Sequence, residues 1–287
     1  MPLAYAAGIG GVITMVGTPP NIIVSGVLTS FGYESFSFFE FAWIGIPLTF
    51  VVIAYMMFIG KYLLPKAELD ADQEIEQEIE ATVTDSKKQI VSGLILAVCI
   101  IVMALDLKAI SLEMTAIVGA LVCVLTGCLT EKQAYSAIDW VTIFLFAGMM
   151  PVSAAMDKTG AGKLIAEWAV SLMGGSPTPI IMTSVLFIIS CTLTQFMSNT
   201  AACALLAPVG VAISQQLGAS PKAVLMAIGV AASCAFATPV GTPPCTLVLG
   251  PGGYKFMDYV KVGVPLVVLC FIVSIIVIPM VWPFFPG

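Results

Sequence analysis

The sequence predicts an all-α polytopic membrane protein with an inverted internal repeat, broken helices and a re-entrant hairpin. Three observations lead to this prediction. The 287-residue chain is 59% hydrophobic and only 10% charged, whereas soluble domains carry about 25% charged residues. Its apolar segments mostly have the length that crosses a bilayer as a helix, about 17–25 residues. Two of these segments, far apart in the chain, contain the same Gly-Thr-Pro-Pro motif.

Seven apolar segments are predicted to span the membrane, and they cover residues 2–30, 41–64, 90–105, 112–129, 140–156, 221–250 and 259–283. An eighth apolar segment, 179–215, is interrupted by the polar sequence Ser198-Asn199-Thr200. Because this segment breaks at polar residues, with limbs of about 18 residues each, we expect a hairpin that dips into the membrane and returns to the same side. The eight cysteines fall within apolar segments and form no CxxC pair, which favours buried packing over metal or disulfide roles.

One long polar segment divides the chain. Residues 68–85 hold eight of the seventeen acidic residues. We interpret 66–89 as an acidic linker between the end of a first repeat (1–65) and a second repeat (90–287); a regulatory or partner-binding role is the alternative. With the linker in the cytoplasm, seven lysines lie inside and four outside, as the positive-inside rule favours. The C-terminus is then predicted to lie outside.

Two anchors define the repeat. Gly-Thr-Pro-Pro occupies 17–20 and 241–244, and Gly-x-Pro-Leu occupies 45–48 and 263–266, so the two offsets nearly agree. If 179–215 is a hairpin, an odd number of steps separates the copies and they run in opposite directions. If 179–215 crosses the membrane instead, the copies are parallel. We expect the inverted arrangement, which is typical of secondary transporters.

The repeated motif has a chemical consequence. Proline removes a backbone donor and clashes with the preceding turn, so each span is predicted to break there. A break inside a bilayer is tolerated where it lines a cavity or is buried in protein. Freed carbonyl groups suit a sodium ion, and freed N–H groups at a helix start suit an anion. The simpler interpretation, a packing kink with Ser-Asn-Thr as a helix cap, is disfavoured by the duplication.

Absent residue types narrow the function further. The chain has no Arg and no His, and no acidic residue lies in the middle of a predicted span. Proton-coupled carriers usually need a titratable relay inside the membrane, so sodium coupling is favoured. An enzyme would need a nucleophile–base or metal constellation and a channel would need a continuous polar pore, and the sequence predicts neither. No nucleic-acid partner is expected.

These motifs resemble the divalent-anion:sodium symporter family, the sodium-coupled dicarboxylate, citrate and sulfate transporters. Members have a Ser-Asn-Thr hairpin tip and a broken helix with a (Ser/Gly)-(Thr/Ser)-Pro-Pro-Asn loop in each half. Residues 196–209, 237–245 and 250–266 match the second half, and 14–21 match the end of the first. Cys245 departs from the pattern, because the family usually has Asn there. An arsenite- or antimonite-type permease of the same superfamily is the alternative.

The resemblance implies a mechanism and a site. A transport unit would move as an elevator against a scaffold formed by 90–156, which would also hold a homodimer together in the cell membrane. Na⁺ would be a transported ion and not a prosthetic group. A small anionic substrate would contact Asn199, Thr200, Thr242 and Thr18. Sodium ions would bind near Thr194, Ser198, Asn199 and Gly241 in the second half, and near Gly17 and Asn21 in the first.

Repeat arithmetic predicts that the first half lacks a partner. Within the second repeat, 90–287, the hairpin 179–215 precedes the broken helix 221–250 and the last span 259–283, and Ser198 stands 43 residues before Gly241. The matching Ser-Asn-Thr of the first repeat would fall before Met1. We therefore expect an N-terminally truncated member with one hairpin, which would not transport by itself.

Overall fold

The computed structural model describes residues 1–65, 86–105, 112–138, 178–239, 241–250 and 252–285, with scattered positions between 140 and 171. These residues are helical wherever they are regular, and no strand occurs among them. Residues 66–85 and much of the predicted span 140–156 lie outside the described residues. The chain divides into two compact units, Met1–Ala67 with Thr142–Gly287, and Glu68–Val141.

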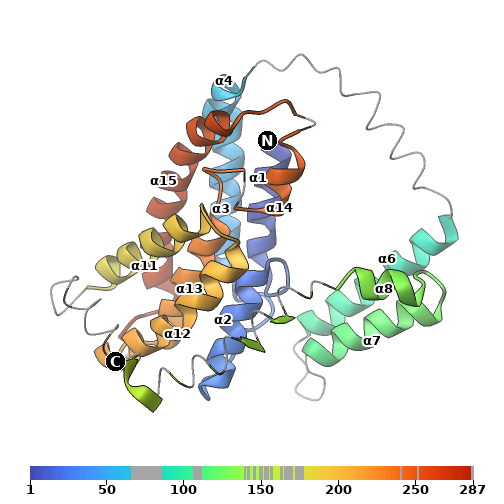
Figure 1. Ribbon diagram of the computed structural model, residues 1–287, viewed down its shortest axis with the longest axis horizontal. Coiled ribbons are helices and arrows are strands. Elements are labelled where there is room, and N and C mark those ends of the chain that lie inside the picture. The colour runs from blue at the N-terminus through green and yellow to red at the C-terminus, as the bar shows by residue number, and fades with distance from the viewer. Residues whose placement is uncertain are drawn as a thin grey trace. The chain divides into compact units, whose positions relative to one another are not determined.

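The larger unit is a bundle of helices (Figure 1). Its elements are α1 (Pro2–Gly10), the 3₁₀ turn η1 (Gly11–Ile13), α2 (Pro19–Ser30), α3 (Ala42–Tyr55), the π-helical turn η2 (Met56–Gly60), α4 (Lys61–Leu63), α11 (Pro179–Thr194), α12 (Asn199–Leu217), α13 (Pro221–Ser233), α14 (Pro243–Leu247) and α15 (Phe256–Val281). The smaller unit contains α6 (Ser86–Ala104), α7 (Leu112–Leu125) and α8 (Glu131–Ser136).

Four helical segments in the described parts are long and apolar enough to cross a membrane, namely Ala42–Leu63, Lys87–Ala104, Asn199–Leu217 and Phe256–Val281. The predicted spans 2–30 and 221–250 are each divided into shorter helices, as expected for broken helices. The predicted span 112–129 is too long, because α7 ends at Leu125 and Gly127 follows with a φ of 71°. A glycine in the left-handed region commonly ends a helix.

α11 and α12 form a helical hairpin around α13. Nearly every residue of α13 is buried, and both limbs pack against it. The Ser190 hydroxyl donates to the Ile228 carbonyl at 2.9 Å. One turn further on, the Thr194 hydroxyl donates to the Ala232 carbonyl at 2.9 Å, so α11 runs parallel to α13. α12 runs in the opposite direction, because Asn199 at its start lies beside Thr194 near Ala232, whereas Gly210, further along α12, packs against Ile228. α11 and α12 therefore form a helical hairpin with its tip at residues 195–198, and its return to the same side of a membrane stays a prediction.

The two broken helices run antiparallel to each other. α1 contacts α14, whereas α2 contacts α13. The Tyr5 hydroxyl donates to the Phe236 carbonyl at 2.9 Å, and Val24 packs against Gly229. The first half of each broken helix thus pairs with the second half of the other, which requires opposite chain directions. The predicted inverted arrangement is confirmed.

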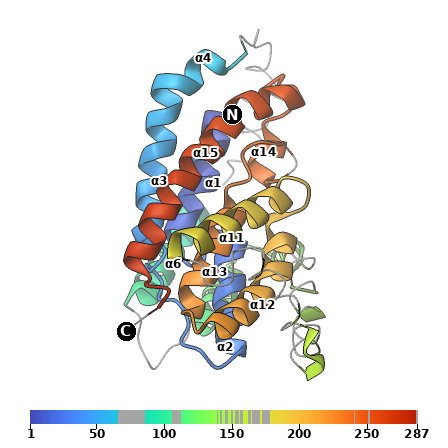
Figure 2. The ribbon, with the colours of Figure 1, turned by 90° about the vertical axis from the view of Figure 1, so that its left-hand side faces the viewer.

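α3 and α15 lie side by side, and each packs against one broken helix (Figure 2). A Cβ added to Gly45 would lie 2.8 Å from the Ile13 Cα, just before the first break. A Cβ added to Gly263 would overlap the Phe236 carbonyl, in the first part of the second break. The repeated Gly-x-Pro-Leu therefore marks the two points where a span meets a broken helix. The outward faces of both helices carry exposed apolar side chains that suit lipid, among them Trp43, Phe50, Phe58, Ile272 and Met280.

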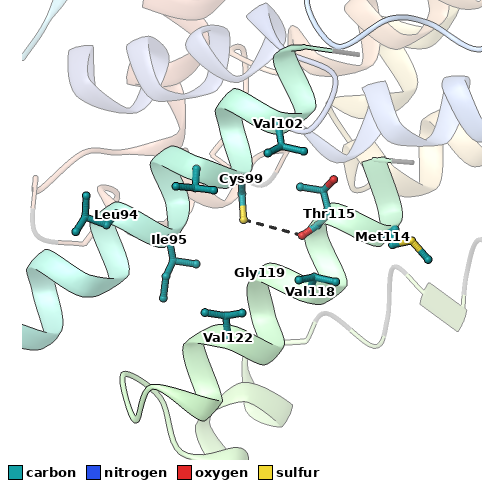
Figure 3. A pocket seen from close by; sticks show the side chains of 10 residues that line it. Leu94, Ile95, Cys99, Val102, Met114, Thr115, Val118, Gly119 and Val122 are labelled. Carbon is teal, nitrogen blue, oxygen red and sulfur yellow. Dashed lines mark hydrogen bonds between the residues drawn. The ribbon is translucent and has the colours of Figure 1, made fainter. Parts of the chain in front are cut away.

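In the smaller unit, α6 and α7 pack as a pair. The Cys99 thiol lies over Gly119 and donates to the Thr115 carbonyl at 3.9 Å. An apolar groove of about 570 Å³ runs along the pair, lined by side chains such as Leu94, Val98, Met114 and Val118 (Figure 3). α6 begins at Ser86, so the last residues of the predicted linker are helical.

Candidate functional site: two helix breaks and a hairpin tip

The first break covers Thr14–Thr18, between η1 and α2. It folds back on itself, because a Cβ on Gly17 would overlap the Gly11 carbonyl oxygen, so position 17 has no room for a side chain. The Asn21 amide nitrogen donates to the Thr14 carbonyl at 2.9 Å and the Val12 carbonyl at 3.4 Å. Asn21 thereby holds the break closed from the first turn of α2.

Asn21 also presents an unused oxygen. Its side chain is fully buried, and its Oδ1 has no hydrogen-bond partner. A buried polar oxygen without a partner is unfavourable by about 1–3 kcal/mol. Such an atom is a natural ligand for a cation, since sodium takes oxygen donors and needs no proton from them. Gly17 and Asn21 both lie against Thr14 in this break, and their role at one sodium site stays a prediction.

The second break repeats the first. It covers residues 234–242, of which 240 is not described. Gly241 matches Gly17 in the repeat, and a Cβ there would lie 2.6 Å from the Ala235 Cβ, at the position that matches Gly11. Thr18 and Thr242, which precede the two Pro-Pro pairs, have nearly the same backbone angles, −146° and 142° against −132° and 140°. The two breaks therefore share the same backbone arrangement where Gly-Thr leads into Pro-Pro.

The hairpin tip closes over the second break. The Thr194 hydroxyl donates to the Asn199 Oδ1 at 3.2 Å as well as to α13. A Cβ on Gly241 would lie 2.8 Å from the Thr194 carbonyl oxygen. Thr194, Asn199 and Gly241, which the sequence predicted as sodium neighbours, thus lie together. Since the Asn199 Oδ1 accepts a hydrogen bond, its amide nitrogen is the group left to donate.

Gln195 joins the tip to the break, and sequence reasoning missed it. Its amide nitrogen donates to the Cys191 carbonyl at 3.0 Å and the Cys234 carbonyl at 3.3 Å. Its Oε1 accepts from the Ala237 N–H at 3.1 Å, and its own carbonyl accepts from the Thr238 hydroxyl at 2.8 Å. The sequence did hold a signal for Gln195, because it is a lone amide at the end of an apolar limb, shortly before Ser198.

The first break also approaches the hairpin. The Cys203 thiol, one turn into α12, donates to the Pro20 carbonyl at 3.6 Å, and α2 packs along α12. The Ser198 hydroxyl accepts from the Ala201 N–H at 3.1 Å, so this side chain caps α12. The start of this 19-residue helix, which carries the positive end of the helix dipole, thus lies near both breaks, through Asn199 beside Thr194 and Cys203 beside Pro20.

The predicted substrate ligands occupy helix starts. Thr18 begins α2 and Thr242 begins α14, and neither hydroxyl caps its own helix. Thr200 lies in the first turn of α12 and is half-buried. No Lys, Asp or Glu occurs in residues 11–21, 194–203 or 234–245. These three segments can therefore bind ions only through uncharged carbonyl, amide, hydroxyl and N–H groups. Such groups suit an ion that is bound and then released.

This fold and site define a membrane carrier of the inverted-repeat class. The model of the citrate transporter family (CitMHS) matches residues 1–108 and 97–285. The chain belongs to this family, and the resemblance to divalent-anion:sodium symporters is confirmed. The family's members are transporters and not enzymes.

Individual relatives agree with this assignment. The chain is 34% identical to an uncharacterized transporter of Haemophilus influenzae over 284 residues, which is 94% of this chain and 60% of that protein. It is 41% identical over 171 residues, 58% of this chain and 28% of the relative, to the transporter YfbS of Escherichia coli. It is 26% identical to the sodium-dependent dicarboxylate transporter SdcS of Staphylococcus aureus, over 100% of this chain and 59% of SdcS. The chain thus spans about 60% of the relatives that it matches over its whole length.

Proposed function

We propose that the protein carries out sodium-coupled symport of a small divalent anion, with a dicarboxylate as the substrate class. The observation that carries the proposal is the buried Asn21 Oδ1, which has no partner and lies beside a helix break that is built twice. The name of the Staphylococcus relative supports both the ion and the anion.

Sodium would bind at both breaks. At the first, Asn21 Oδ1 and backbone carbonyls around Gly17 would coordinate the ion. At the second, oxygens of Thr194 and Asn199 with backbone near Gly241 would do so. These are neutral oxygen donors, so binding one Na⁺ leaves a net positive charge at each break. That charge would attract the anion and couple its binding to sodium.

The anion would bind where the helix starts meet. Several groups there could donate hydrogen bonds to the anion. They are the N–H groups of the first turn of α12, the Asn199 amide nitrogen and the hydroxyls of Thr200, Thr18 and Thr242. Donors at a helix N-terminus favour a carboxylate oxygen. The two carboxylates of one substrate would then each bind to a separate set of donors, one set from each half of the repeat.

Movement of the site would follow an elevator scheme. The division into two compact units supports it, because both broken helices and the hairpin belong to the larger unit. The smaller unit would then form part of the scaffold and of a homodimer contact. The protein would lie in the cell membrane with residues 66–89 in the cytoplasm and the C-terminus outside.

The test is uptake of labelled succinate by proteoliposomes that contain the product of the complete gene. We expect uptake with an inward sodium gradient and none when choline replaces sodium. Asn199→Ala should reduce uptake severalfold, since one buried hydrogen-bonding group is worth about 1–3 kcal/mol. Gln215→Ala is the matched control, because Gln215 is an exposed amide near the other end of α12. Uptake that follows a proton gradient and ignores sodium would show the proposal to be wrong.

A further inference from the structure

One difference between the two copies of the repeated motif removes a hydrogen-bond donor. Asn21 of the first break corresponds to Cys245 of the second, since both follow Gly-Thr-Pro-Pro. In the first break the Asn21 amide donates to the Val12 and Thr14 carbonyls. A cysteine thiol cannot supply this pair of strong donors. The second break must therefore hold its matching carbonyls by other means.

The carbonyl that matches Val12 is that of Phe236. It accepts a hydrogen bond from the Tyr5 hydroxyl at 2.9 Å, whereas the corresponding bond from Asn21 to Val12 measures 3.4 Å. Tyr5 lies in α1, in the other repeat and 231 residues away. A donor from the opposite repeat thus takes the place of one of the two hydrogen bonds that an amide at position 245 would supply.

We infer that Tyr5 is a positioning residue for the second break and replaces, across the repeat boundary, the bond that the Asn21 amide donates to the Val12 carbonyl within the first. This inference rests on the proposed function. Tyr5 does not touch the ion or the anion. It fixes the Phe236 carbonyl, and through it the backbone that leads to Gly241 and Thr242.

The surroundings of Tyr5 support this role. Its side chain is fully buried, and its ring meets the Phe236 ring edge-on with centroids 5.1 Å apart. The Phe236 carbonyl also packs closely against Gly263 of α15, where a Cβ would overlap it. The Phe236 peptide is therefore held between α1 and α15, and Tyr5 provides the polar half of that grip. Without the hydroxyl, a buried carbonyl loses its donor.

Other carbonyls of the second break have their own donors. Gln195 serves the Cys234 carbonyl, and the Thr246 hydroxyl serves the Pro239 carbonyl at 2.7 Å. These donors come from the second repeat itself. Loss of the Tyr5 hydroxyl should therefore increase backbone mobility around Phe236, while the hydrogen bonds at Cys234 and Pro239 stay in place.

The first test measures uptake against sodium concentration in proteoliposomes with the complete gene product. Tyr5→Phe should raise the half-saturating sodium concentration about fivefold, the effect of one lost hydrogen bond, and leave the maximal rate nearly unchanged. Ser214→Ala is the control. It removes another fully buried hydroxyl-to-carbonyl bond, to Val211 at 2.7 Å within α12, away from the break. Adding Cys245→Asn to Tyr5→Phe should restore the wild-type value, because the amide returns.

The second test needs no transport. Amide hydrogen exchange of peptides that cover residues 234–242 is compared in detergent for the same variants. Exchange should rise in Tyr5→Phe, fall again when Cys245→Asn is added, and stay unchanged in Ser214→Ala. If wild-type uptake ignores sodium, the proposed function fails, while this comparison still decides the role of Tyr5.

Three results overturn the inference. The first is unchanged exchange over 234–242 in Tyr5→Phe. The second is a loss in Tyr5→Phe that Cys245→Asn does not repair. The third concerns folding: if Tyr5→Phe alone is not recovered from membranes, the double variant should be, and recovery of neither contradicts a positioning role that the amide can replace.

Discussion

At the scale of single residues, Asn21 has two roles in the first break. Its nitrogen ties two carbonyls and its oxygen remains buried and free of partners. The nitrogen bonds fix the direction of the amide, so the oxygen is oriented before any ion binds. A ligand that is oriented in advance loses little conformational entropy on binding.

Asn21→Ala should therefore weaken sodium binding more than it weakens the fold. We expect the half-saturating sodium concentration for uptake to rise about tenfold, because an oxygen ligand and two buried hydrogen bonds are lost together. Sodium titration of uptake in proteoliposomes measures this. Ser274→Ala is the control, because Ser274 of α15 also carries a buried oxygen without a partner. Removing that hydroxyl should leave the titration unchanged, and equal shifts in the two variants would contradict a ligand role for Asn21.

At the scale of elements, the repeat extends beyond the broken helices to the spans that follow them. Each Gly-x-Pro-Leu places its glycine against the backbone at the start of a break, at Ile13 and at Phe236. Interiors are packed closely enough that one added methyl group is felt. The glycines of α3 and α15 therefore set how near each span approaches its broken helix.

Gly45→Ala and Gly263→Ala should both destabilise the protein, by about 1–3 kcal/mol as for other overpacked sites. The effect should be larger at 263, where a Cβ overlaps a backbone carbonyl, than at 45, where it lies 2.8 Å from the Ile13 Cα. Thermal unfolding in detergent, followed by loss of the monodisperse fraction, gives the order. Gly10→Ala is the control, since nothing lies within 4 Å of a Cβ there. A control as unstable as Gly263→Ala would show that the cause is glycine replacement and not packing.

Local patterns predicted the elements of this fold better than their contacts. Pro-Pro marked both breaks because proline acts on its own turn, and Ser-Asn-Thr marked the hairpin tip. Helix ends were less predictable. α15 begins at Phe256 and not at 259, because the Asp258 carboxylate accepts a hydrogen bond from the Lys255 N–H at 2.8 Å and so stabilises an earlier helix start. The contact of Tyr5 with Phe236 left no local signal, because it joins residues that meet only when the two repeats pair.

At the scale of the whole molecule, the contacts and the repeat divide the chain differently. The division into 1–65, 66–89 and 90–287 follows chain order and stays a prediction. The compact units instead group 1–67 with 142–287. The physical reason is that an inverted repeat pairs its first half with its second around a shared core, here α13. Chain order alone does not reveal that core, whereas the duplicated motifs do.

The same pairing predicts the sidedness of the protein. In the larger unit, α3 and α4 lead toward the linker at one end, while α15, which starts near that end, runs back for 26 residues toward the C-terminus (Figure 1). At 1.5 Å per residue, α15 is about 39 Å long, enough to cross a bilayer. The linker and the C-terminus should therefore lie on opposite faces, and the lysine bias puts the linker inside.

Protease accessibility in cells checks this arrangement. A C-terminal epitope tag should be removed by protease added to intact cells, whereas a cleavage site inserted at residues 66–85 should be cut only after permeabilisation. A cytosolic marker protein reports that the cells stayed sealed. If 179–215 is a hairpin, the chain crosses the membrane an odd number of times between the linker and the C-terminus. The tag and the linker site should then be cleaved from opposite sides of the membrane. Cleavage of both in intact cells would mean that α12, which is long enough to span, crosses the membrane and that the hairpin does not return.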